Sequence, residues 1–111
     1  MAADLAALIR KFQRYDFDIT VHAYQEMLND DISVEMLVSV IGYDAPQVCE
    51  DYVFDERGAS CLILGYGLED LPMHVVVAYH TIKPIVITTY KNPDRNIWED
   101  DLCTRRANRV V

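Results

Sequence analysis

Long hydrophobic runs and secretion signals are missing from this sequence. No stretch of the 111 residues approaches the roughly 20 consecutive apolar residues that a transmembrane helix needs. The N-terminus lacks the charged region, apolar core and cleavage site of a secretory leader. Glycine and proline, four of each, are too few for a fibrous or disordered chain. We therefore expect one globular domain over residues 1–111, located in the cytoplasm and without a membrane partner.

Cysteine is also scarce, and its spacing argues against two kinds of site. Cys49, Cys61 and Cys103 are odd in number and form no CxxC pair. This pattern is unlike a disulfide framework and unlike a zinc site of the usual spacing. We expect three reduced thiols, as is usual in the cytoplasm, and no bound metal or other cofactor.

Basic side chains are few in most of the chain. The net charge is −8, and three of the ten basic residues (Arg105, Arg106 and Arg109) lie in the acid-free polar tail 104–111. Residues 1–103 therefore carry seven basic and 18 acidic side chains, a net charge of −11. A body this acidic repels the phosphate backbone of nucleic acids. RNA binding would have to depend on a local basic group, and the tail is the obvious one.

The first 42 residues show helical patterns. Thr20 is suited to cap a helix over residues 20–29, and Ser33 to cap another over 34–41. Apolar residues recur at helical spacing within residues 2–14, which predicts a first helix whose buried face consists of Leu5, Leu8, Ile9 and Phe12.

From residue 47 the pattern changes to strands joined by short connections. The predicted strands are 47–54, 61–66, 73–80 and 85–90. Short connections between consecutive strands predict antiparallel pairing. The expected fold class is α+β, with N-terminal helices packed on an antiparallel sheet of about four strands in meander order, and Trp98 is expected to return over the core.

The predicted strand 73–80 has a histidine near each end. Side chains alternate across a strand, so His74 and His80 share one face. We expect His80 to be exposed where the strand ends, whereas a neighbouring element can bury His74. On the second helix, His22 and Glu26 are four residues apart and close enough to interact.

The sequence contains few other signals of a functional site. Tyr90 ends the last strand and is followed by a small polar and basic group, including Lys91 and Arg95, that could contact phosphate. A glycine-rich phosphate loop, a nucleophile elbow and a metal-binding helix motif are all absent.

Three segments together resemble a known family. They are HAYQEMLNDDIS at 22–33, LPMHVVV at 71–77 and ITTY at 87–90, followed by Trp98. Their order is similar to the signature of a small bacterial family catalogued as a domain of unknown function (4258), over about residues 20–98. That family is itself similar to the metal-independent ribonuclease toxins of the RelE and barnase-like superfamily, which have helices on an antiparallel sheet.

The resemblance implies RNA cleavage by general acid-base chemistry. His22 and His74 match polar positions of the family and become the acid-base candidates, with Tyr90 as a partner for phosphate or a proton. The implied partners are RNA and an antitoxin protein. Substrate affinity is assigned to basic side chains near the C-terminus: Arg95, Arg105 and Arg106.

The sequence departs from the family at three charged positions. Glu26 and Asp30 stand where the family usually has arginine, and Asp31 stands where it has glycine. A carboxylate cannot stabilise a pentavalent phosphate as an arginine does. Three hypotheses stay open: an enzyme that uses another cation such as Arg105 or Arg106, an enzyme with a different substrate, and a non-catalytic interaction module whose acidic surface binds a basic partner.

Overall fold

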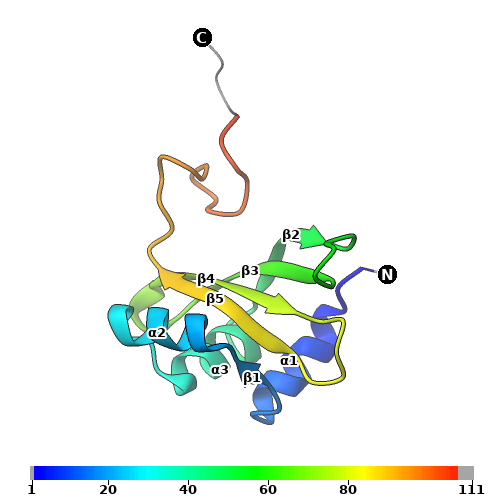
Figure 1. The fold of residues 1–111 in the computed structure, drawn as a ribbon. Coiled ribbons are helices and arrows are strands. Elements are labelled where there is room, and N and C mark those ends of the chain that lie inside the picture. The colour runs from blue at the N-terminus through cyan, green and yellow to red at the C-terminus, as the bar shows by residue number, and fades with distance from the viewer. Residues whose placement is uncertain (1, 108–111) are drawn as a thin grey trace.

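The computed structural model describes residues 2–107 and has the α+β arrangement that the sequence predicts (Figure 1). Its helices are α1 (Leu5–Gln13), α2 (Val21–Asp30) and α3 (Val34–Gly42). Thr20 and Ser33 cap α2 and α3 as predicted, because each side chain accepts a hydrogen bond from a backbone N–H in the first turn. Asp4 does the same for α1.

The sheet has five strands in the order β1-β5-β4-β3-β2. The last four form the predicted antiparallel meander: β2 (Gln47–Tyr52), β3 (Ser60–Tyr66), β4 (Pro72–Ala78) and β5 (Ile85–Lys91). A short 3-10 helix, η1 (Leu68–Asp70), joins β3 to β4.

The predicted count of four strands and the purely antiparallel sheet are wrong. An additional strand, β1 (Asp18–Ile19), pairs in parallel with the start of β5 and makes the sheet mixed. Two residues are too few to show the alternation by which a strand is recognised in a sequence.

The helices cover one face of the sheet (Figure 1). Alternate side chains of the central strands point to this face and are fully buried against the helices. The core here includes Phe12, Leu37, Ile41, Ile63, Met73, Val75 and Val77.

A segment after β5 covers the opposite face of the sheet (Figure 1). We call residues 94–106 the strap. Its Trp98 and Leu102 are buried against Leu62 and Leu64 of β3, so the predicted return of Trp98 is confirmed. An antiparallel bridge joins Trp98 to Arg105 and folds the strap into a hairpin. Of the predicted polar tail, Arg109 lies outside the described residues.

Candidate functional site

His74 and Tyr90 are direct neighbours on β4 and β5. The strand register pairs them, and the Nδ1 atom of His74 lies 2.9 Å from the hydroxyl oxygen of Tyr90. Their ring centroids are 5.3 Å apart in an edge-to-face arrangement. The structure therefore brings together two of the candidate catalytic residues.

The strap closes over His74. The Nε2 atom lies 2.6 Å from the carbonyl oxygen of Leu102, and the Trp98 ring packs against the imidazole with centroids 4.6 Å apart. The His74 side chain has 0% exposure. Because a carbonyl only accepts hydrogen bonds, Nε2 carries the proton. In the neutral ring, Nδ1 then accepts a hydrogen bond from the Tyr90 hydroxyl.

Burial keeps His74 neutral. It lowers the pKa of the imidazole below the ordinary 6.5, although the Leu102 carbonyl acts in the opposite direction. The unfolded chain therefore binds a proton at a pH where the folded chain does not.

Acidification is thus expected to destabilise the fold in a defined range. The stability that His74 provides is complete above about pH 6.5 and is lost as pH falls through the lowered pKa of the folded state. Urea unfolding measured between about pH 7.5 and pH 5.5 should show this loss. A variant with His22 and His80 replaced by alanine should show the same loss, because His74 is then the one remaining histidine. An NMR titration of His74 at or above its ordinary pKa would contradict the expectation.

Arg105 lies beside this cluster but is bound to a carboxylate. Its Nε and Nη2 atoms donate to Glu50 of β2 at 2.7 and 3.1 Å, and its guanidinium stacks on Trp98 at 4.6 Å from the ring centroid. The Tyr52 hydroxyl donates to Glu50 as well. Burial raises the pKa of Glu50, but the bonds from Arg105 and Tyr52 outweigh it and the pKa is lowered. Sequence reasoning gave no role to Glu50.

The prediction of three reduced thiols is wrong for two of them. Cys49 of β2 and Cys103 of the strap form a disulfide, with Cα atoms 4.9 Å apart. Cys61 is the free cysteine, and it is buried in the core. The two cysteines are 54 positions apart in the sequence, so no local spacing signals the bond.

His22 does not join His74 and Tyr90. It is an exposed residue of α2, and its Nε2 atom lies 3.4 Å from the carboxylate of Glu26. The predicted interaction between His22 and Glu26 is confirmed, whereas the catalytic role of His22 stays a prediction.

Two acidic residues of α2, Glu26 and Asp30, bind the edge of β5. Glu26 accepts hydrogen bonds from the hydroxyl of Thr88 and, at 3.3 Å, from the backbone N–H of Thr89. One helical turn later, Asp30 accepts from the N–H of Lys91 at 3.2 Å. Four residues of helix and two of strand advance by similar lengths, about 6 and 6.6 Å, so the two carboxylates match alternate N–H groups. They accept hydrogen bonds from backbone N–H groups that would otherwise be unpaired at this edge of the sheet.

Removal of the Glu26 carboxylate should therefore destabilise the fold. We expect Glu26→Ala to lower the free energy of unfolding by about 1–2 kcal/mol, because the Thr89 N–H and the Thr88 hydroxyl lose their acceptor. Glu26→Gln retains a carbonyl oxygen and should cost less than half as much. Urea unfolding and exchange of the Thr89 amide measure the two effects. Equal losses in both variants would mean that charge rather than edge pairing matters.

Arg95 and Arg106 lie together in the strap. The Nε atom of Arg106 donates to the Arg95 carbonyl at 2.7 Å, and its guanidinium pairs with Glu99 at 3.2 Å. Both arginines also approach Asp100, at 4.0 and 3.7 Å. All three candidate substrate-binding arginines therefore have acidic neighbours, and their substrate role stays a prediction.

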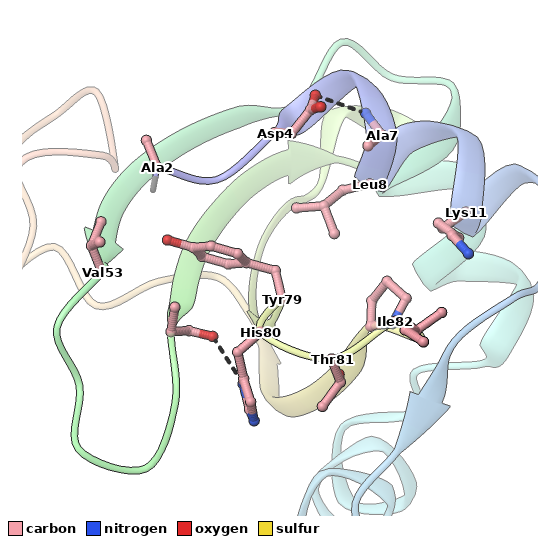
Figure 2. A pocket seen from close by; sticks show the side chains of 12 residues that line it. Ala2, Asp4, Ala7, Leu8, Lys11, Val53, Tyr79, His80, Thr81 and Ile82 are labelled. Carbon is pink, nitrogen blue, oxygen red and sulfur yellow. Dashed lines mark hydrogen bonds between the residues drawn. The ribbon is translucent and has the colours of Figure 1, made fainter.

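A cavity of about 390 Å³ lies elsewhere, between α1 and the connection from β4 to β5 (Figure 2). Leu8, Tyr79 and Ile82 form apolar parts of its wall, and Lys11, which pairs with Asp16 at 2.9 Å, lies at its side. His80 also lines it and is exposed as predicted. Sequence reasoning missed this cavity because its wall combines three segments that are distant in the sequence, within residues 2–11, 53–59 and 79–84.

Within residues 2–107, no group of three or more His, Cys, Asp or Glu side chains is placed to hold a metal ion. No helix in this part of the chain is both long and apolar enough to cross a membrane.

Comparison with known proteins gives one match. No curated protein and no solved structure matches the chain. A family model described as a domain of unknown function, DUF4258, matches residues 19–91. The match includes His22, His74 and Tyr90 and ends before the strap. Because the match spans more than half of the 111 residues, the chain belongs to the DUF4258 family.

Proposed function

We propose that this chain is a protein-interaction module that binds a basic segment of another protein. The observation that carries the proposal is a group of five exposed carboxylates at one end of the sheet, which we call the acidic end: Asp30, Asp31, Glu35, Glu69 and Asp70. The cytoplasm stays the predicted compartment.

Several segments meet at the acidic end. Asp30 at the end of α2 contacts Lys91 at the end of β5, and the Asn92 N–H donates to the carbonyl of Pro72 at the start of β4. Figure 1 shows the end of α2, the β3–β4 connection and the end of β5 on the same side of the molecule. Within residues 28–31, 33–36, 66–72 and 90–92, the one basic side chain is Lys91. The resulting negative potential favours a cationic partner.

An apolar groove accompanies these charges. Met36 of α3 and Leu68 of η1 line a cavity of about 320 Å³ together with Glu35. Leu68 is 83% exposed, which leaves a large apolar side chain at the rim. A segment with an apolar residue between lysines or arginines fits both features, because its apolar side chain can enter the groove while its cations approach the carboxylates.

The closed geometry around His74 favours binding over catalysis. A general base must reach the proton that it removes. His74 has no exposed surface, and both ring nitrogens are engaged by Tyr90 and Leu102. RNA therefore has no access to this imidazole while the strap is closed.

Charge-neutral variants test the proposal. Calorimetry with a synthetic peptide that has a leucine pair between lysines should show binding to the wild-type protein. Replacing Glu69 by Gln and Asp70 by Asn should weaken it roughly fivefold, at less than 1 kcal/mol per charge contact. Asp18→Asn with Glu56→Gln is the matched control, because it changes the net charge equally at other exposed sites. No binding, or equal weakening in both variants, would contradict a specific acidic end.

RNA cleavage is a second candidate, favoured by the hydrogen bond between His74 and Tyr90 within the matched family region. Nδ1 of the neutral ring is a proton acceptor, and Arg105 lies near enough to provide a cation if it leaves Glu50. Incubation of the protein with RNA in chelator, after reduction of the Cys49–Cys103 disulfide that holds the strap, tests this function. Cleavage by the wild type that Tyr90→Phe abolishes would support it, and intact RNA in both reactions would exclude it.

A further inference from the structure

The end of the strap is attached to the edge strand of the sheet. Cys103 is bonded to Cys49 of β2, and Arg105 pairs with Glu50, the next residue of the same strand. β2 is the terminal strand of the sheet, opposite β1. One covalent bond and one ion pair at adjacent positions therefore hold the end of the strap.

The strap covers a titratable side chain, His74, as well as apolar side chains. Apart from its packing on Leu62 and Leu64, it provides the Leu102 carbonyl and the Trp98 ring that enclose His74. Tyr90 is only half-buried beside it. The strap also lies outside the matched family region, which ends at residue 91. Its departure would expose His74 and leave the five strands paired as they are.

The third cysteine is unsuited to exchange with this bond. Cys61 is fully buried, and burial raises its pKa to about 12. Exchange requires a thiolate, so Cys61 stays a thiol. Cys49 is half-buried on the edge strand whereas Cys103 is buried, so Cys49 is the more accessible of the two bonded cysteines.

We infer that the Cys49–Cys103 disulfide is a site of thiol-disulfide exchange that controls access to the face bearing His74 and Tyr90. A dithiol reductant attacks one sulfur, the Cys49–Cys103 bond breaks, and a mixed disulfide forms. The second thiol of the reductant then resolves it. The protein gains two electrons and two protons as two thiols, and the reductant becomes a disulfide. With the bond broken, the strap detaches and the His74 face opens.

The single tryptophan of the chain makes this measurable, since Trp98 lies in the strap and is 2% exposed. Reduction of the wild-type protein with dithiothreitol should shift its fluorescence to longer wavelength. The amides of Trp98 and Leu102, bonded within the strap, should exchange at least tenfold faster, while those of β3 and β4 stay protected. Cys49→Ser with Cys103→Ser should behave as reduced protein without any reductant.

Cys61→Ala is the matched control, because it removes a thiol and keeps the disulfide. It should respond to dithiothreitol as the wild type does. Unchanged fluorescence and exchange after complete reduction would overturn the inference, since the strap would then be held by packing alone. Faster exchange in every strand would also overturn it, by showing that the bond supports the whole fold. Neither result depends on peptide binding at the acidic end.

Discussion

Replacement of His74 by alanine is expected to lower the free energy of unfolding by about 3–4 kcal/mol, among the largest effects of any single substitution here. The change leaves a cavity where the imidazole was packed between Tyr90 and Trp98. It also leaves the Leu102 carbonyl without its donor and the Tyr90 hydroxyl without its acceptor. Urea unfolding followed by far-UV circular dichroism gives the difference without depending on Trp98 fluorescence.

His80→Ala is the matched control for this substitution. His80 is exposed just beyond the same strand, and its Nδ1 atom is a distant 3.4 Å from the Ala59 carbonyl. Its loss should change stability by less than about 0.5 kcal/mol. Equal stability of the two variants would show that His74 is not part of the folded core.

Trp98→Ala is expected to cost about 3–5 kcal/mol, as removal of a buried tryptophan usually does. The ring packs on the His74 imidazole, supports the Arg105 guanidinium and contacts the β3 leucines. With the disulfide intact, the strap should stay tethered but lose its packing. Hydrogen exchange of the Leu102 and Arg106 amides should then rise more than exchange in β4.

Ile97→Ala provides the comparison within the strap. Ile97 is the neighbouring residue and is 47% exposed, so its truncation removes little buried surface. We expect a loss below about 1 kcal/mol. If both variants lost the same stability, the strap would contribute through its backbone rather than through Trp98.

The elements that the sequence predicts well are those with local signals. Thr20 and Ser33 mark helix starts because their side chains bond to the first turn, and alternation marks the four long strands. β1 has no local signal, because its two residues are defined by pairing with β5. The strap hairpin likewise depends on contacts with β2 and β3, which are distant in sequence.

In the candidate site, too, the features with a local signal are predicted and those that depend on distant contacts are not. His74 is a candidate because a histidine interrupts an apolar strand, and the strand register places it against Tyr90. Pairing of Cys49 with Cys103 could not be read from the sequence, since neither has a neighbouring cysteine. The resemblance predicts that Glu26 and Asp30 replace catalytic arginines, whereas in the structure they accept hydrogen bonds from the edge of β5. Composition alone does not distinguish a surface charge from an edge acceptor.

The central structural claim is that the closed strap denies RNA access to His74, and its most direct test is an RNA-cleavage assay with the oxidised protein in chelator. We predict that wild-type protein and Tyr90→Phe leave the RNA equally intact, because the strap denies RNA access to His74. Cleavage by the oxidised wild type that Tyr90→Phe abolishes would contradict the account and identify the His74–Tyr90 pair as catalytic in the closed fold.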